Sequence, residues 1–193
     1  MMALLLAAAV PSAAKTPATM KILSVTGGTL TLGKEALEPG AELTPGKEVI
    51  LSSGAEAVLD AKGWGKLFLH GPVYFTPRAE GDDGVEVRAG GILAKLKSRS
   101  GRAFSIGTPA AVAAVRGTTF FVEARSKKQS YICICRGELS VESRVEKFRT
   151  VIKSGSDNHH KPYLFRAGGG ASSLSEAAME RHSDEEIESL DAK

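Results

Sequence analysis

The sequence has little in it that indicates catalysis. It contains no Gly-x-Ser-x-Gly elbow for a nucleophile and no Gly-rich loop of the Walker type to hold a phosphate. The acidic residues Asp82 and Asp83 fall in a Gly-bounded stretch typical of a hairpin turn, with too few oxygen ligands for a calcium site. We therefore expect a protein that is not an enzyme and that needs no cofactor for chemistry.

An excess of charge of one sign is also absent. The chain has 25 Lys and Arg against 22 Asp and Glu, a formal net charge of +3. Lys95, Lys97, Arg99 and Arg102 alternate with smaller or apolar residues, as on the solvated face of a strand that leads into a turn. This mild charge gives no reason to expect nucleic acid as a partner, whereas it is compatible with an anionic component of a cell envelope as a partner.

Long apolar runs are missing as well. The longest lies within Met1–Val10, shorter than the ~20 residues that a membrane-spanning helix needs. Pro11 and three small residues follow it before Lys15, which is the pattern of a signal peptide over residues 1–14. No cysteine follows the run, so a lipid anchor is not indicated. We expect a periplasmic or secreted protein with no transmembrane segment in its mature chain.

Cysteine is scarce: the chain has two, and one residue separates them. On a strand Cys133 and Cys135 would share one face, with parallel side chains about 6.6 Å apart at Cα, so a disulfide between them would be strained. They are either bridged through a local distortion or small buried core residues. The sharper alternative is a zinc or copper site that adds imidazoles from His159, His160 or His182.

Short alternating runs separated by glycine fill most of the chain. With 21 glycines to make turns, they predict many short strands and few helices. The fold class is therefore all-β, with the strands in a solenoid-like or sandwich stack and a short helix at the C-terminus. The clearest strand candidates are Thr29–Leu32, Glu48–Leu51, Ala57–Leu59, Lys66–Leu69, Val73–Phe75, Val85–Val87, Ile92–Leu96 and Thr118–Val122.

The most specific pattern runs from Thr108 to Val141. A Thr108-Pro109 pair opens it, because proline suits a strand start and not a ladder interior. Gly117, between apolar runs, indicates a corner or a backbone packed against another layer. Arg116 and Thr118 flank that corner, and a second turn is centred on Gly137. We assign these residues structural roles.

This layout resembles the FecR family, and the same order of features extends over roughly Val25–Val141. In the founding members of that family the domain lies in the periplasm below an outer-membrane iron-siderophore receptor and passes its signal to a sigma factor in the cytoplasm. The resemblance implies a β-solenoid-like fold and a protein partner in the envelope. Because the chain begins directly with the apolar run, we expect a stand-alone member without the cytoplasmic sigma-regulating region.

The chain divides by composition into four parts. They are a signal peptide (1–14), a FecR-like all-β domain (15–143), additional strands (144–166), and a flexible linker with a short helix (167–193). Ser183 with Glu186 forms the capping pattern of that helix, and Ile187 and Leu190 could dock it. We predict a non-catalytic exported binding or signalling module. A metal- or redox-handling envelope protein that uses Cys133, Cys135 and the C-terminal histidines is the alternative.

Overall fold

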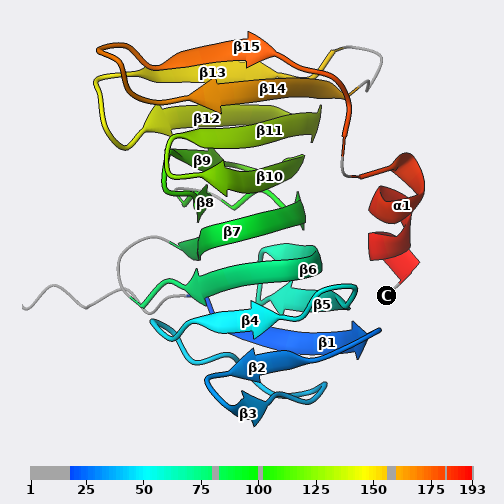
Figure 1. Cartoon of the computed structure of the whole chain (residues 1–193). Helices are drawn as coiled ribbons and strands as arrows, with labels where there is room; N and C mark the ends of the chain where they lie inside the picture. Colours follow the sequence, from blue (N-terminus) through cyan, green and yellow to red (C-terminus); the bar gives the residue numbers. More distant parts are fainter. Residues whose placement is uncertain (1–17, 80–82, 100–101, 156–159, 181, 193) are drawn as a thin grey trace, which may run out of the picture.

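The computed structural model describes residues 18–79, 83–99, 102–155, 160–180 and 182–192, so the predicted signal peptide lies outside the described residues. Within them the chain forms one 15-stranded sheet and a single helix (Figure 1). The elements are β1 (Met20–Thr26), β2 (Leu30–Leu32), β3 (Glu35–Ala36), β4 (Val49–Leu51), β5 (Glu56–Ala61), β6 (Gly65–Pro77), β7 (Asp83–Leu96), β8 (Phe104–Gly107), β9 (Ala111–Val115), β10 (Thr119–Ser126), β11 (Gln129–Arg136), β12 (Glu138–Ser143), β13 (Arg149–Lys153), β14 (Lys161–Arg166), β15 (Ser173–Glu176) and α1 (Asp184–Ala192).

Two long strands, β6 and β7, each belong to two branches of the sheet. The first part of β6 pairs with β5 and its last part with β4. The last part of β7 pairs with β10, whereas its first part pairs with β8 in the only parallel ladder of the described strands. Both strands bend in between, at the Gly71-Pro72 peptide and at Gly90. The sheet therefore folds back on itself into two layers.

Glycine is required where the two bends meet. Gly90 has φ +86°, and a Cβ there would lie 2.3 Å from the Pro72 carbonyl oxygen. A side chain cannot occupy that space, so β7 bends against β6 only with glycine at this position.

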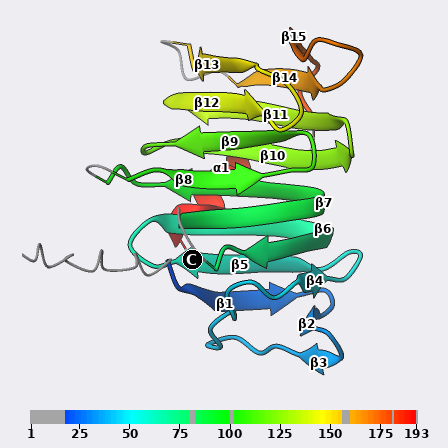
Figure 2. The ribbon, with the colours of Figure 1, turned by 90° about the vertical axis from the view of Figure 1, so that its left-hand side faces the viewer.

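One layer, called here the inner-turn layer, contains β2, β3, β4, β8, β9, β12 and β13. The other, called the helix layer, contains β1, β5, β10, β11, β14 and β15. Figure 2, seen from the side opposite α1, shows the strands stacked in the manner of a solenoid, with the helix behind them. The predicted all-β class with a short C-terminal helix is confirmed.

The main core lies between the layers. Alternate residues of each strand point into it, such as Phe120 and Val122 of β10 and Ile132 and Ile134 of β11. Each large side chain that is removed from water in this way stabilises the fold by about 1.5–3 kcal/mol. The largest of the fully buried side chains in this core are Trp64, Phe75, Phe104, Phe120 and Phe165.

A second group of buried residues covers the outside of the helix layer, and we call it the outer apolar cluster. Its strand residues alternate with those of the main core, so β10 contributes Phe121 and β11 contributes Tyr131. The C-terminal part of the chain packs over it, and Leu190 of α1 is only 2% exposed. The cluster consists of Val58, Phe68, Leu93, Phe121, Tyr131, Cys133, Cys135 and Leu190.

Several local predictions are corrected by the structure. The runs Lys66–Leu69 and Val73–Phe75 are parts of one strand, β6, because the intervening glycine and proline bend the chain without ending it. The same holds for Val85–Val87 and Ile92–Leu96 in β7. Asp83 begins that strand and is buried, with an ion pair to Arg102, and so is not a solvated turn residue.

The C-terminal tail adds strands and the helix. β13 and β14 lie in the segment where the sequence predicts additional strands. β15, which pairs with β14, lies in the segment where it predicts a linker. At the start of α1, the Ser183 backbone N–H donates to Glu186 Oε2 at 2.8 Å and the Glu186 N–H donates to Ser183 Oγ at 3.3 Å. The predicted capping pattern is therefore present, and the helix docks through Leu190 and Ile187.

Candidate metal centre

The two cysteines lie side by side on the outer face of β11. Cys133 and Cys135 belong to the outer apolar cluster, whereas Ile132 and Ile134 between and before them belong to the main core. Both thiols are free, and their residues are 0% and 5% exposed. The alternation expected for a strand thus places the two sulfur atoms on one side, and no disulfide joins them.

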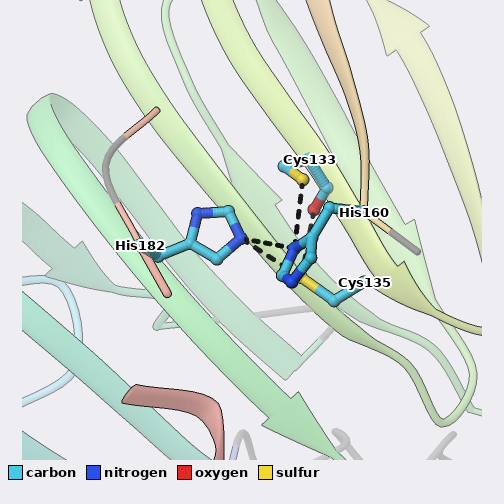
Figure 3. Close-up of side chains that lie close together, drawn as sticks. All are labelled: Cys133, Cys135, His160 and His182. Atoms are coloured by element: carbon cyan, nitrogen blue, oxygen red, sulfur yellow. Dashed lines mark hydrogen bonds between the residues drawn. The ribbon is translucent and has the colours of Figure 1, made fainter. Parts of the chain in front are cut away.

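Two histidines reach these thiols from other segments. His160 precedes β14, whose Lys161 is the register partner of Ile134, so strand pairing carries His160 to Cys135. His182 lies two residues before α1 and arrives with the C-terminal segment. Figure 3 shows the four side chains pointing toward one another. One donor atom from each of Cys133, Cys135, His160 and His182 lies within 4.8 Å of all the others.

Three of the separations are short. Cys135 Sγ is 3.3 Å from His182 Nε2, and His160 Nδ1 is 3.2 Å from the same nitrogen. Cys133 Sγ is 3.8 Å from His160 Nδ1. The contacts join β11, the start of β14 and the segment before α1 into one cluster.

Neighbouring groups fix the orientation of both imidazoles. His160 turns its other nitrogen, Nε2, toward Asp184 Oδ1 at 2.7 Å. The ring of His182 stacks on Phe121 with centroids 5.0 Å apart and an interplanar angle of 20°. Nδ1 of His182 is buried and has no hydrogen-bond partner among the described residues. The histidine nitrogens that face the thiols are therefore positioned by a carboxylate in one case and by an aromatic ring in the other.

Met179 closes the site on the side of the C-terminal segment. Its Sδ lies 3.9 Å from Cys133 Sγ. Nearby, the Tyr131 hydroxyl accepts a hydrogen bond from the Glu180 backbone N–H at 3.0 Å and donates to the Ala178 carbonyl at 3.3 Å. Burial raises the pKa of Tyr131 to about 12, so the hydroxyl stays protonated and can make both bonds.

The two thiols differ in protonation because they share a hydrogen bond. The hydrogen bond from Cys135 and the two histidines lower the pKa of Cys133 to about 5, against the effect of burial. The same hydrogen bond and burial raise the pKa of Cys135 above its usual range. Burial lowers the pKa of His160, but its hydrogen bonds to Asp184 and Cys133 outweigh burial and the net direction is upward. The cluster therefore favours one thiolate beside a protonated imidazole.

Two kinds of chemistry suit such a cluster. Cys133, His160 and Asp184 together resemble the nucleophile, base and orienting acid of a thiol hydrolase. A nucleophile must meet its substrate, however, and Cys133 is fully buried beneath Met179 and the C-terminal segment. Two sulfur and two nitrogen donors around one point are the usual ligand set of a structural tetrahedral metal site. The geometry therefore favours a metal over a covalent catalyst.

The remaining residues of the predicted cysteine and histidine set divide simply. His160 and His182 join the cysteines, and His159 lies outside the described residues. Asp184 and Phe121 were not predicted. Asp184 follows His182 by two residues at the helix start, a spacing that would have justified testing it, whereas the stacking of Phe121 on His182 depends on the path of the tail.

The residues of the Arg-Gly-Thr corner meet the second glycine turn. Gly117 has φ +78°, and a Cβ there would lie 2.7 Å from the backbone nitrogen of Ser98. Thr118 is buried, and its hydroxyl donates to the Glu138 carbonyl at 2.8 Å. A Cβ on Gly137 would lie 3.1 Å from the Gly117 carbonyl oxygen. The two turns thus pack on each other, whereas Arg116 is exposed beside them.

Thr108 stabilises the turn between β8 and β9. Its hydroxyl accepts a hydrogen bond from the Ala111 N–H at 3.0 Å and lies 2.7 Å from Ser130 Oγ of β11. Pro109 occupies the turn itself, where no ladder hydrogen bond is needed. This hairpin of the inner-turn layer is therefore tied to the helix layer through one buried pair of hydroxyls.

A cavity of about 310 Å³ adjoins the cysteine and histidine cluster, and Cys135, His160 and Asp184 contribute to its wall. A second cavity of about 650 Å³ lies near the end of α1. Lys66, which contributes to its wall, donates from Nζ to the carbonyl oxygen of Leu190 at 2.8 Å, so the cavity reaches the end of α1. Its basic lining residues are Lys66, Lys95, Lys97 and Arg136.

Comparison with known proteins identifies the central part of the fold. Residues 68–140 match the family model described as FecR protein. This central segment resembles a FecR domain. The matched segment runs from within β6 to within β12. It therefore includes the bends of β6 and β7, the corner at Gly117 and both cysteines. His160 and His182 lie beyond it, so the cysteine and histidine cluster joins the matched segment to the tail.

Solved structures share this fold. Two crystal structures of a putative anti-sigma factor from Parabacteroides distasonis ATCC 8503, at 1.65 and 2.50 Å resolution, superpose with TM-scores of 0.53 and 0.52. Both are 16% identical in sequence, and the matches cover 69% and 67% of this chain and 60% and 59% of theirs. The chain thus spans about three fifths of those structures. No curated protein matches it. Among the described residues, no helix has the length and apolar character to cross a membrane.

Proposed function

We propose that this protein is an exported, non-catalytic FecR-like module of the bacterial cell envelope that acts in signalling by binding a protein partner. The observation that carries the proposal is the FecR match over residues 68–140, which coincides with the central strands of the sheet. The description of the two similar structures as an anti-sigma factor supports a regulatory role. The pattern of a signal peptide over residues 1–14 supports a periplasmic or secreted location.

The edge strand β13 offers a surface for such a partner. Its only ladder in the described sheet is with β12, so its other edge has unpaired backbone groups. Val151 on this strand is 48% exposed, and Val145 in the preceding turn is 63% exposed. An extended segment of another protein can pair with such an edge and cover an apolar side chain at the same time. We assign the partner surface to β13.

The buried thiols support the absence of catalysis. The Cys-His-Asp arrangement is the nearest approach to a catalytic group among the described residues, and its sulfur atom is covered. Metal or redox handling is favoured by one observation only, the convergence of four donor atoms. None of the comparisons points to it. Because a signalling module can also hold a structural ion, the cluster does not by itself make metal handling the function.

The proposal can be tested by photo-crosslinking in the native bacterium. A photoreactive residue in place of Val151 is compared with one in place of Lys34, an exposed residue of the β2–β3 turn. We expect the protein in the osmotic-shock fraction and one crosslinked envelope protein from position 151 alone. Retention in the cytosolic fraction would overturn export. Equal crosslinking from both positions would overturn β13 as the partner surface.

A further inference from the structure

The metal cluster has the dimensions of a tetrahedral site. With Zn–S bonds of about 2.3 Å and Zn–N bonds of about 2.05 Å, a tetrahedron has edges of about 3.3 Å between two nitrogens and about 3.5 Å between nitrogen and sulfur. The separation of the two histidine nitrogens is 3.2 Å, and those of the two Cys-His pairs are 3.3 and 3.8 Å. Because the other separations are at most 4.8 Å, small side-chain shifts suffice to close the site.

The surroundings also resemble those of a metal site. A histidine ligand usually donates its second N–H to a carboxylate or carbonyl, which fixes the tautomer and raises the basicity of the ligating nitrogen. His160 has this arrangement, with Asp184 2.7 Å from Nε2 while Nδ1 faces the thiols. Four protein ligands leave no open position, as in a structural site.

We propose that Cys133, Cys135, His160 and His182 bind one Zn²⁺ ion, which clasps the C-terminal segment, residues 177–192, onto the outer apolar cluster. This inference is independent of the proposed function. Zinc is preferred to Cu⁺ because two thiolates and two imidazoles in a tetrahedral arrangement match its structural sites. The ion joins three separate parts of the chain: two ligands belong to β11, one precedes β14 and one precedes α1.

The clasp acts where few other contacts hold the segment. Between β15 and α1 the main links to the sheet are the hydrogen bonds of Tyr131, the ion pair of Glu180 with Arg125 at 2.5 Å, and the bond from the Ala177 N–H to the Pro162 carbonyl at 3.0 Å. Beyond His182, Leu190 and Ile187 pack on the outer apolar cluster, and Lys66 Nζ donates to the Leu190 carbonyl at 2.8 Å. Since metal binding to the folded state stabilises whatever the ligands order, zinc would protect this segment most. Removing the ion would loosen the segment and uncover apolar residues such as Phe121 and Leu93.

Metal binding is measured on the purified full chain under reducing conditions. Zinc is titrated against a chromophoric chelator, and Co²⁺ is added separately because tetrahedral thiolate ligation gives it characteristic absorption. We expect about one ion per chain, lost in Cys133→Ser and in His182→Ala. His70→Ala is the matched control, because His70 is exposed and its imidazole lies 3.6 Å from Glu56, away from the four proposed ligands. Asp184 is exposed and is not one of the four ligands, so Asp184→Asn leaves the ligand set intact. Because it removes the carboxylate that orients His160, this variant should weaken zinc binding about 10–100-fold.

The clasp is measured separately by hydrogen exchange. With zinc, amides of residues 177–192 should exchange more slowly than after chelation, while those of β6 and β7 should not change. Absence of zinc binding with both thiols free, or equal weakening by His70→Ala, would overturn the site. Tight binding of Cu⁺ without Zn²⁺ would overturn the choice of ion. Zinc binding without a change in exchange would overturn the clasp. Crosslinking at Val151 is scored independently, so the failure of either proposal leaves the other measurable.

Discussion

Replacing Gly117 by alanine should destabilise the FecR domain strongly, and the reason can be separated into two parts. An alanine at φ +78° would adopt the left-handed region, which costs roughly 1–2 kcal/mol. Its Cβ would also lie 2.7 Å from the Ser98 backbone nitrogen and 2.8 Å from the Ser98 Cβ. Because the nearest atom belongs to the Ser98 backbone and not to the far end of a flexible side chain, relieving this overlap requires a shift of the main chain after β7 and adds about 1–3 kcal/mol.

Gly33 provides the matched control. It has φ +62°, and a Cβ there would meet nothing within 4 Å. Gly33→Ala should therefore cost only the backbone part, about 1–2 kcal/mol. The smaller entropy of the unfolded chain, worth about 0.4–1 kcal/mol, acts equally on both variants and cancels in their difference.

The two variants are compared by urea unfolding followed by circular dichroism, with the free energy extrapolated linearly to water. We expect Gly117→Ala to be the less stable by about 1–3 kcal/mol, with an unchanged dependence on urea. Equal losses in the two variants would refute the reasoning, because they would show that the close approach to Ser98 does not restrict position 117.

Two further predictions concern single hydrogen bonds. Tyr131→Phe removes the hydroxyl that binds the Glu180 N–H and the Ala178 carbonyl, so hydrogen exchange of the Glu180 amide should accelerate. The free energy of unfolding should change by only about 1 kcal/mol. Tyr163→Phe is the control, and equal exchange of the Glu180 amide in the two variants would contradict the role assigned to the Tyr131 hydroxyl. Thr118→Val keeps the shape of the side chain but removes the hydroxyl that donates to the Glu138 carbonyl at 2.8 Å. The free energy of unfolding in urea should therefore fall by about 1–3 kcal/mol. An unchanged urea midpoint would show that water replaces the hydroxyl.

Local patterns in the sequence predicted the class of the fold because they depend on which face of a strand is buried. Alternation alone placed Cys133 and Cys135 on one face and Ile132 and Ile134 on the other, as the structure shows. The capping pair at Ser183 was equally local. By contrast, Gly71 and Gly90 carry the same sequence signal as a turn glycine, so the continuity of β6 and β7 was missed.

The candidate site was only partly predictable. That His160 reaches the two cysteines follows from the pairing of β14 with β11, and the register of distant strands is not evident from their composition. The place of His182 depends on how the tail crosses the outer apolar cluster. Residue types therefore indicated a soft metal ligand set, but the convergence of His160 with the cysteines and the part played by Asp184 required the three-dimensional arrangement.

The sharing of β6 and β7 between the two layers has a consequence for how the stack comes apart. In an ordinary solenoid each repeat touches only its neighbours, so unfolding can begin anywhere and spread. Here neither layer can separate from the other while β6 and β7 keep their pairings to β4, β5, β8 and β10. We expect the middle of the stack to open only in global unfolding and the terminal strands β2, β3 and β15 to open first. The protein would then behave as a firm central block with two loose ends, one of them carrying the tail that His182 attaches.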